Sequence, residues 1–292
     1  MNIAIVTPTY NRIGLLNRLY KSLLKQSNYS FTWIVVDDGS MDNTSEYIEK
    51  LDAPFNIRYF KQENSGKVKA LNLAFDKNND IDFFLIVDSD DYLLEYAIEI
   101  VLKTSNKYLM NKNVGAIFFR YQFENGEVIG QGKNTPSGEI LMSRIEHDAK
   151  YDKVDGCIWY FQRTVKKYKY PTIDNEKYMG PTVIQLMMSE EYKIAFINRV
   201  IGVAEYQLGG LTNSGRRIRI LSPISMLIYT HYMQDSQFNW LIRIKYGIMS
   251  NTYFYYAKRN NKEHSIVSQL RIPKVLRIPG YLLAKIWEKK YL

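Results

Sequence analysis

The sequence predicts an α/β fold, in which a mostly parallel sheet is flanked by helices and followed by a helical C-terminal region. Strand-length apolar runs alternate with amphipathic stretches over the first ninety residues, which is typical of parallel strands joined by helical crossovers. The run Phe83–Val87 is apolar on both faces, as expected of a strand at the centre of such a sheet. Beyond Gly209 and Gly210, helical patterns continue to the end of the chain.

Four runs in the first half have the length and the β-branched or aromatic content of strands. They are Ile3–Val6, Trp33–Val36, Ile57–Phe60 and Phe83–Val87. Between them, Ile13–Lys25 and Lys67–Phe75 carry apolar residues at helical spacing. The alternation predicts parallel strands joined by right-handed crossovers, in a Rossmann-like arrangement.

The middle of the chain is less regular. We expect a helix over Leu93–Leu109, a loop or hairpin from Glu124 to Gly138, and a helix near Thr182–Ser189. Further strands are expected at Val114–Tyr121, Cys157–Gln162, Ile194–Ile197 and Val200–Tyr206. We find no internal repeat.

The last part of the chain is predicted to be helical. Ser222 and Pro223 indicate a helix start, because a hydroxyl cap and a proline both suit the first turn. Pro273 and the pair Pro279 and Gly280 are expected to interrupt the helices that follow. We therefore divide the chain into an α/β domain, residues 1–212, and a helical region, residues 213–292.

The charge of the protein is concentrated in one segment. Lys and Arg number 39 and Asp and Glu 30, which gives a net charge of +9. Basic and acidic residues cancel over residues 1–242, so residues 243–292, with 11 basic and 2 acidic residues, carry the whole surplus. A uniformly basic nucleic-acid-binding domain would not have this distribution, and we expect no nucleic-acid partner.

The cellular setting follows from other simple features. A single cysteine, Cys157, excludes an intrachain disulfide framework and suits a reducing compartment. The first residues lack the features of a signal peptide, and no apolar stretch is long enough to span a bilayer. We expect a cytoplasmic protein, with peripheral contact to the inner face of the plasma membrane.

Polar clusters follow three of the predicted strands. They are Thr7 to Arg12, Asp37 to Ser40, and Asp88 to Asp91. Ligands of open parallel sheets bind at the carboxyl ends of the strands. Carboxylates gathered there repel one another unless a cation joins them, and all-oxygen donors suit Mg²⁺ or Mn²⁺ held together with a nucleotide's phosphates. Each cluster alone could also be a turn or a helix cap.

These clusters and one further segment resemble the successive motifs of family 2 glycosyltransferases. The segments are Val6–Arg12, Val36–Thr44, Asn64–Lys67 with Ala70–Asn72, and Asp88–Asp91, in the order and spacing of the family. The resemblance implies the GT-A fold and an inverting reaction on a nucleotide sugar. Glu205 and Tyr206, followed by Gly210–Thr212, are similar to a segment of bacterial members that build surface polysaccharides.

The resemblance also implies roles for individual residues. Those expected at the nucleotide are Thr7, Pro8, Tyr10, Asp37, Asp38, Lys67 and Asp88. Tyr10 would offer a stacking face, Asp38 or Asp37 would contact the base, and Asp88 would face the ribose. Asp90 would bind the Mg²⁺ or Mn²⁺ that bridges the diphosphate, and Lys67 would lie near the base or diphosphate.

An inverting transfer also needs a carboxylate that deprotonates the acceptor hydroxyl. Glu176 matches an acidic position of similar sequences, whereas Pro181 and Thr182 stand where an acidic residue is expected before the helix. The candidates for the base are therefore Glu176 and another carboxylate, namely Asp91, Asp155 or Glu205. Loss of activity is the other reading of this departure.

The C-terminal segment combines basic and apolar residues. In Tyr281–Lys290, the side chains of Leu282, Leu283, Ile286 and Trp287 are expected on one face, with lysines elsewhere. This pattern fits either an interfacial helix on an anionic membrane or a helix packed on the domain. Upstream, Arg216, Arg217 and Arg219 are candidates for contact with a diphosphate, or they are solvated.

The predicted function is a metal-dependent inverting glycosyltransferase. It would move a sugar from a nucleotide donor, expected to be UDP-linked, to a glycan or lipid-linked acceptor in capsule or other surface polysaccharide assembly. A non-catalytic sugar-nucleotide-binding or scaffold protein is the alternative from another class. A sugar-1-phosphate nucleotidyltransferase fits less well, because its glycine-rich phosphate loop is absent near the N-terminus.

Overall fold

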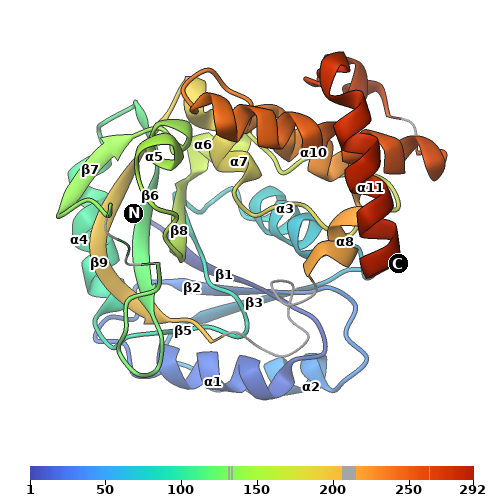
Figure 1. The fold of residues 1–292 in the computed structure, drawn as a ribbon. Helices are drawn as coiled ribbons and strands as arrows, with labels where there is room; N and C mark the ends of the chain where they lie inside the picture. Colours follow the sequence, from blue (N-terminus) through green and yellow to red (C-terminus); the bar gives the residue numbers. More distant parts are fainter. Residues whose placement is uncertain (131, 133, 206–214, 263) are drawn as a thin grey trace.

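A nine-stranded mixed sheet forms the centre of the molecule (Figure 1). The computed structural model describes residues 1–130, 132, 134–205, 215–262 and 264–292. The strands follow the order β3-β2-β1-β4-β8-β6-β9-β5, and β7 pairs with β9. Their bounds are β1 Ile3–Thr9, β2 Thr32–Asp37, β3 Asn56–Lys61, β4 Phe83–Ile86, β5 Tyr92–Leu93, β6 Val114–Gln122, β7 Glu139–Met142, β8 Gly156–Phe161 and β9 Lys193–Val203.

The four strands β1 to β4 are parallel, as predicted. β1 lies between β2 and β4, with Thr9 opposite Asp37 and Val6 opposite Ile86. All seven residues of β1 and all four of β4 are buried, which explains their apolar character on both faces. The carboxyl ends of β1, β2 and β4 therefore meet at one edge of the sheet.

The other half of the sheet is mixed. β8 runs antiparallel to both β4 and β6, and β6 runs parallel to β9. The predicted strands at 194–197 and 200–206 form one long strand, β9, over its described residues. Register shifts opposite Phe119 and Arg120 bend the β6–β9 pairing, so that the polar residues between the two predicted runs remain within the strand.

Helices cover both faces of the sheet (Figure 1). Their bounds are α1 Ile13–Leu23, α2 Thr44–Glu49, α3 Lys67–Lys77, α4 Ala97–Tyr108, α5 Arg144–Lys150, α6 Gln162–Lys167, α7 Val183–Met187, α8 Gly215–Leu221, α9 Pro223–Tyr232, α10 Trp240–Arg259 and α11 Arg277–Tyr291, with 3₁₀ turns at Met188–Glu190, Ser265–Gln269 and Lys274–Leu276. Alternate residues of β1 face the two layers. Ile5 shares one buried apolar cluster with Leu16 of α1, and Val6 shares the other with Leu71 of α3.

The helix predicted over residues 93–109 begins later than expected. Tyr92 and Leu93 form the short strand β5, which pairs with Val203 and Gly202 of β9. The amide of Leu94 continues this pairing by donating to the carbonyl of Ile201 at 2.9 Å. Because these tertiary hydrogen bonds hold the backbone extended, α4 begins only at residue 97.

The C-terminal helices confirm two proline expectations and correct a third. α9 starts at Pro223, and the chain breaks at Pro273 before a 3₁₀ turn. Pro279 and Gly280, however, lie within α11 without interrupting it. Pro279 occupies the first turn of that helix, where a backbone N–H has no intrahelical acceptor, so the proline does not remove a helical hydrogen bond.

The helical region and the sheet contribute residues to one common apolar core. One apolar cluster contains Val6 and Phe84 of the sheet together with Leu227 of α9, Tyr253 of α10 and Trp287 of α11. The division at residue 212 lies among residues 206–214, outside the described residues, and stays a prediction.

Candidate active site at the carboxyl ends of the parallel strands

Residues at the end of β1 form the first wall of the site. Thr7 is fully buried, and its hydroxyl accepts a hydrogen bond from the indole nitrogen of Trp33 at 3.0 Å. Pro8 is also buried, whereas Tyr10 is 41% exposed. Of these three predicted nucleotide-site residues, Tyr10 offers an accessible ring.

The two aspartates at the carboxyl end of β2, its last residue Asp37 and the following Asp38, hold loops together. Asp37 is fully buried and accepts hydrogen bonds from the amide of Ser40 at 2.7 Å and the hydroxyl of Tyr59 at 2.7 Å. Asp38 accepts from the amides of Ser65 at 2.8 Å and Gly66 at 2.9 Å. Asp38 thus fixes the loop that leads into α3.

Gly66 is required at the start of α3. Its φ is +96°, and a Cβ atom there would lie 2.3 Å from the carbonyl oxygen of Lys177. A side chain would therefore push the α3 loop away from the segment that contains Glu176. This close approach explains the glycine in the motif Asn64–Lys67.

Three carboxylates gather after β4. Asp88, Asp90 and Asp91 are each partly buried, and the amide of Asp91 donates to the carbonyl of Asp88 at 3.0 Å. Burial and the charges of Asp88 and Asp90 raise the pKa of Asp91 well above its usual range. A carboxylate with a raised pKa is suited to accept a proton near neutral pH.

Two of these carboxylates are paired with cations from other loops. Lys67 Nζ lies 2.5 Å from Asp88 Oδ2, and Arg12 Nη1 lies 2.7 Å from Asp90 Oδ2. Burial alone would lower the pKa of Lys67, but the charge and hydrogen bond of Asp88 outweigh it and raise that pKa. The predicted nucleotide residues Lys67 and Asp88 thus contact each other directly.

The donor set fits a hard divalent cation. The site offers carboxylate oxygens only, and the buried Oδ1 atom of Asp88 has no hydrogen-bond partner. Within the described part of the chain, no group of three or more His, Cys, Asp or Glu side chains is arranged to hold a metal ion. A cation here would therefore take further ligands from a bound diphosphate and water.

The side chain of Glu176 is buried, and both of its carboxylate oxygens accept hydrogen bonds. Its Oε1 accepts from the amide of Ile224 at 3.0 Å, and its Oε2 accepts from the amide of Ser225 at 2.8 Å. Lys262 Nζ lies 3.4 Å from Oε1, and the side chain has no exposed surface. In this arrangement Glu176 serves as the cap of α9, a role that its sequence context did not indicate.

The remaining base candidates differ in their surroundings. The negative charge of Asp155 also raises the pKa of Asp91. Glu205 pairs with Arg18, and the guanidinium of Arg18 also donates to the backbone carbonyl of Asp90. Tyr206 and the segment Gly210–Thr212 lie outside the described residues.

Sequence reasoning assigned no role to Arg12 or Arg18, although both contact Asp90. The position of Arg12 as the last residue of the polar cluster at the end of β1 was the available signal. The contact of Arg18 depends on how α1 lies against the β4 loop, and no local pattern in the sequence reports that.

Three other polar residues, one histidine and two arginines, lie against aromatic rings. His147 is buried, stacks on Phe196, and lies 3.2 Å from Asp148. Arg216 lies over the ring of Trp287, and Arg219 over that of Tyr178, so both contact aromatic faces.

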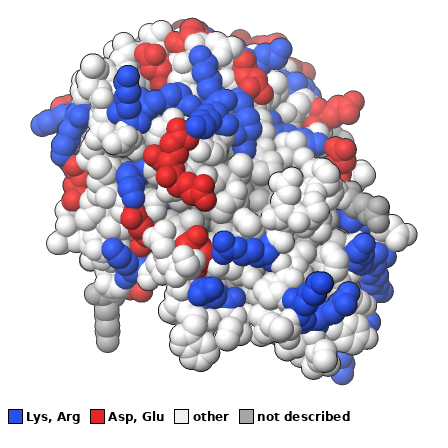
Figure 2. Space-filling model, turned by 90° about the horizontal axis from the view of Figure 1, so that it is seen from above, with Lys and Arg blue, Asp and Glu red and all other residues white. Residues whose placement is uncertain are grey.

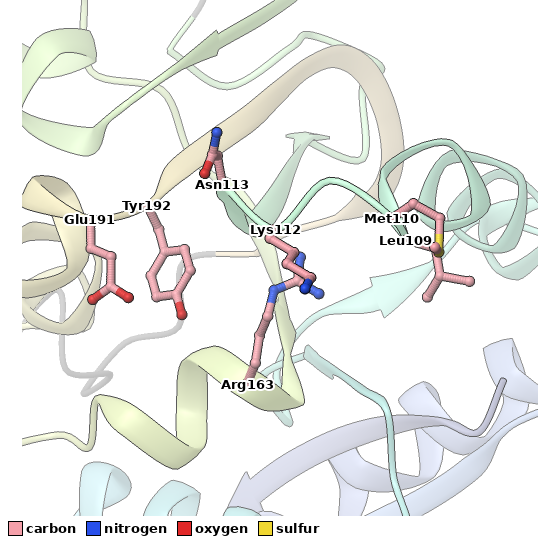
Figure 3. Close-up of a pocket in the computed structure, with 7 residues that line it drawn as sticks. All are labelled: Leu109, Met110, Lys112, Asn113, Arg163, Glu191 and Tyr192. Carbon is pink, nitrogen blue, oxygen red and sulfur yellow. The ribbon is translucent and has the colours of Figure 1, made fainter.

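A separate groove lies at the opposite edge of the sheet (Figure 3). It has a volume of about 480 Å³ and is lined by Leu109, Met110, Lys112, Asn113, Arg163, Glu191 and Tyr192. These residues precede β6 and β9 or follow β8. Because β8 is antiparallel to β4, its end lies at the amino end of β4, away from the aspartates.

Comparison with known proteins establishes the class. Residues 4–169 match the family described as Glycosyl transferase family 2, which is more than half of the chain. The chain therefore belongs to glycosyl transferase family 2, and the family resemblance of the strand-end motifs is confirmed.

Curated relatives share parts of this chain. An uncharacterized glycosyltransferase of Rickettsia conorii is 37% identical over 101 residues, covering 35% of this chain and 17% of the relative. The poly(ribitol-phosphate) beta-N-acetylglucosaminyltransferase TarP of Staphylococcus aureus is 27% identical over 199 residues, covering 67% and 57% of the two chains. The chain thus spans only part of the length of these relatives.

Solved structures confirm the fold. The structure of S. aureus TarS 1-349 in complex with UDP-GlcNAc has a TM-score of 0.63 at 17% identity and covers 96% of this chain and 79% of its own. The mannosyltransferase PcManGT of Pyrobaculum calidifontis, in complex with GDP-Man and Mn²⁺, has a TM-score of 0.58 at 14% identity and covers 99% and 88%. The chain has the GT-A fold, as expected from the sequence.

Proposed function

We propose that this chain is a metal-dependent, inverting glycosyltransferase that uses a nucleotide-sugar donor. The observation that carries the proposal is the gathering of Asp88, Asp90 and Asp91 beside Lys67 and Arg12 at the carboxyl ends of the parallel strands. Membership of glycosyl transferase family 2 supports the same chemistry. The structures of TarS with UDP-GlcNAc and of PcManGT with GDP-Man support a nucleoside-diphosphate sugar as the donor. We propose UDP as the donor nucleotide.

Residues of the nucleotide site divide into two groups in this proposal. Tyr10, Lys67 and Asp88 are accessible enough to touch the nucleotide, with the Tyr10 ring as a stacking face. The other predicted residues form the wall behind this group. Thr7, Asp37 and Asp38 hydrogen-bond to neighbouring protein groups, and Pro8 is buried.

Asp90 would hold Mg²⁺ or Mn²⁺ in this proposal. A divalent cation bound there supplies positive charge to the diphosphate leaving group as negative charge develops on it. The presence of Mn²⁺ with PcManGT supports this assignment. Without a cation, the negative charges of Asp88 and Asp90 raise the pKa of Asp91. A divalent cation at Asp90 would relieve this repulsion between the carboxylates.

We propose Asp91 as the general base. The acceptor hydroxyl oxygen forms a bond to the anomeric carbon, and the bond from that carbon to the phosphate oxygen breaks. The proton of the hydroxyl passes to the Asp91 carboxylate, and the nucleoside diphosphate leaves with the electron pair. Glu176, the other candidate, has both oxygens engaged with α9 and no exposed surface, so we assign it a structural role.

The acceptor is proposed to be a glycan, free or linked to a lipid, in capsule or other surface polysaccharide assembly. The relatives' names support acceptors of polymeric kind, since they include poly(ribitol-phosphate) beta-N-acetylglucosaminyltransferase and chondroitin synthase. No nucleic acid is expected to compete for the site, because its strand ends carry an excess of carboxylates.

One experiment tests the transfer chemistry. The purified protein is incubated with a panel of nucleotide sugars and Mg²⁺ or Mn²⁺, and release of nucleoside diphosphate is measured. We expect release that is lost in Asp90→Ala and retained in Lys289→Ala. Donor binding without release for every acceptor tested would favour the scaffold alternative, and release of pyrophosphate would favour a nucleotidyltransferase.

We also propose peripheral contact with an anionic membrane through the outer face of α11. Ile278, Leu282 and Ile286 follow one another at a spacing of four residues and are 74%, 55% and 60% exposed. Trp287, expected on the same face, instead packs against Tyr253 and is 7% exposed. Among the described residues, no helix is both long and apolar enough to cross a membrane.

The charge around this face complements an anionic surface. Lys and Arg gather in the lower right of Figure 2, on the side where α11 lies, and no described Asp or Glu is seen among them in that part of the view. Within the described part of α11, Glu288 is the acidic residue, and it pairs with Arg259 and Lys285. Basic residues next to exposed apolar ones are the features that interfacial helices use.

Flotation with lipid vesicles tests this contact. The wild type is expected to float with vesicles that contain about one third phosphatidylglycerol and to remain behind with pure phosphatidylcholine. The double variant Leu282→Ser and Ile286→Ser is expected to lose flotation, while Met110→Ser, an exposed apolar residue after α4, keeps it. Equal flotation of the double variant and the wild type would rule the contact out.

A further inference from the structure

The two outer carboxylates after β4 are each held by one cation in this structure. Lys67 Nζ lies 2.5 Å from Asp88 Oδ2, and Arg12 Nη1 lies 2.7 Å from Asp90 Oδ2. The pairs connect three loops, because Arg12 follows β1 and Lys67 begins α3. Their charges cancel within the pairs.

The backbone at Arg12 is fixed by its neighbours. Asn11 has a φ of +50°, its amide donates to Ser40 Oγ at 2.9 Å, and its side-chain oxygen accepts from the amide of Met41 at 2.8 Å. The amide of Ile13 donates to Asp42 Oδ2 at 3.3 Å. Only the side chain of Arg12 is therefore free to change partner.

The side chain of Arg12 is accessible. It is 27% exposed and that of Asp90 is 17% exposed, so the ion pair lies at the surface of the site. A pair in this position is weakly stabilised and can open at small cost. Arg18 differs, because it binds the backbone carbonyl of Asp90, pairs with Glu205 and lies over the ring of Tyr92. The backbone of Asp90 thus stays anchored when its side chain changes partner.

We propose that Arg12 is an exchange residue, which neutralises Asp90 in the absence of donor and moves to the diphosphate when Asp90 binds a divalent cation. The inference rests on the proposed function, because it takes Asp90 as the metal ligand. A guanidinium and a divalent cation on one carboxylate repel each other, so Arg12 must leave for the cation to bind well. A diphosphate gives the displaced guanidinium a new partner, and the planar fork of arginine suits phosphate oxygens.

The exchange couples the two ligands. When no nucleotide is bound, Asp90 binds a cation poorly, because Arg12 competes for its carboxylate and has no other anion to pair with. With a nucleoside diphosphate present, Arg12 is drawn away and Asp90 becomes available. The affinity for the cation and that for the nucleotide must then rise together, by the same factor in each direction.

Binding of Mn²⁺ to the purified full chain, with and without UDP, tests the inference. It is followed by electron paramagnetic resonance of free Mn²⁺, which does not depend on catalysis. In Arg12→Gln, the Mn²⁺ dissociation constant without UDP is expected to fall about three- to fivefold, the factor that a weak, partly exposed ion pair allows. The tightening of Mn²⁺ binding by UDP is expected to shrink by the same factor.

Two variants act as controls. Arg12→Lys keeps a positive charge beside Asp90 and is expected to restore most of the wild-type coupling. Arg58→Gln removes a similar arginine–aspartate pair, with Nη2 2.6 Å from Asp80 Oδ2 at the far edge strand β3, and is expected to bind Mn²⁺ as the wild type does. Thermal unfolding of each variant verifies that it is folded.

The possible failures can be told apart. If Mn²⁺ and UDP bind together in the wild type and Arg12→Gln has the same Mn²⁺ affinity without UDP as the wild type, the exchange is wrong while the proposed function stands. If UDP binds and Mn²⁺ does not bind in any variant, the metal site at Asp90 is wrong, and the exchange falls with it. If UDP does not bind at all, the proposed nucleotide site fails.

Discussion

The carboxylate of Glu176 caps α9, with Oε2 2.8 Å from the amide nitrogen of Ser225. The neighbouring amide of Ile224 donates to Oε1 at 3.0 Å. The first amides of a helix have no intrahelical acceptors, and a negative charge at this end also favours the helix dipole. The segment before α7 and the first of the long C-terminal helices are thereby joined by one buried side chain.

Glu176→Gln is expected to lower stability and to leave catalysis nearly intact. The amide can accept through one atom only, so one helix amide loses its partner, at a cost of about 1–3 kcal/mol in the free energy of unfolding. Urea unfolding at pH 7 measures this loss, with the exposed Asp174→Asn as a control that should remain within about 0.5 kcal/mol of the wild type. A wild-type stability together with a hundredfold loss of kcat would instead identify Glu176 as the base.

Asp91→Asn is expected to abolish most of the transfer activity without weakening the binding of the donor nucleotide. General-base catalysis contributes about 10²- to 10⁴-fold to a rate, so kcat should fall by that factor. UDP affinity should change little, because the proposed nucleotide contacts come from Tyr10, Lys67 and Asp88. Titration with UDP and initial-rate measurements separate the two effects. A retained kcat would move the base to Asp155 or Glu205.

The sheet and the strand-end motifs could be predicted because their signals are local. The apolar run of β4 and the polar residues that follow it are adjacent in the sequence, and parallel strands bring such ends together. The role of Glu176 could not be predicted in this way, since its partner amides lie 48 and 49 residues further on. The start of α4 was missed for a similar reason, because the pairing of Leu93 with Gly202 outweighs its helical pattern.

The face of the last helix also depends on tertiary contacts. The sequence places Leu282, Ile286 and Trp287 within one apolar stripe, yet Trp287 turns to Tyr253 and Arg216. α10 meets α11 closely at Gly280, whose carbonyl accepts from the Thr252 hydroxyl at 3.0 Å. Hydrophobic periodicity shows that a helix has an apolar side. How much of that side is buried depends on where the neighbouring helix packs against it.

Gly280→Ala is expected to destabilise the contact between α10 and α11. A Cβ atom there would lie 2.4 Å from Asn251 Cβ and 3.0 Å from the carbonyl oxygen of Ile248, so the helices must separate, at a cost of about 1–3 kcal/mol. Gly14→Ala in α1 is the matched control, because a Cβ atom there meets nothing within 4 Å. That change should stabilise the protein by about 0.5–1 kcal/mol. Thermal unfolding of both variants measures the difference, and equal midpoints would contradict the close packing.

A buried ion pair beside the sheet gives an expectation for acid stability. Asp148 Oδ1 lies 2.9 Å from Arg144 Nε and 3.2 Å from His147 Nδ1, and the side chains of Asp148 and Arg144 are nearly inaccessible. Burial alone would raise the pKa of Asp148, but the hydrogen bond from His147 and the charges of Arg144 and Lys153 hold that pKa below its usual value.

The sign of the pH effect follows from this lowered pKa. An aspartate whose pKa is lower in the folded state stabilises the protein above its unfolded pKa of about 3.9, and the stabilisation is lost as pH falls through the folded value. Asp148→Asn should therefore cost about 3 kcal/mol in the free energy of unfolding at pH 7, because it leaves Arg144 buried without its carboxylate. The gap between variant and wild type should narrow below about pH 4.

Urea unfolding at pH 7, 5, 4 and 3 measures the gap for Asp148→Asn. Asp80→Asn is the matched control, because Asp80 also pairs with an arginine and also has a lowered pKa, yet it lies at the surface with its side chain 52% exposed. Exposed pairs contribute little, so Asp80→Asn should cost less than about 1 kcal/mol at every pH. A gap for Asp148→Asn that stays constant from pH 7 to pH 3 would show that the variant acts through packing, and that the charge of Asp148 does not stabilise the fold.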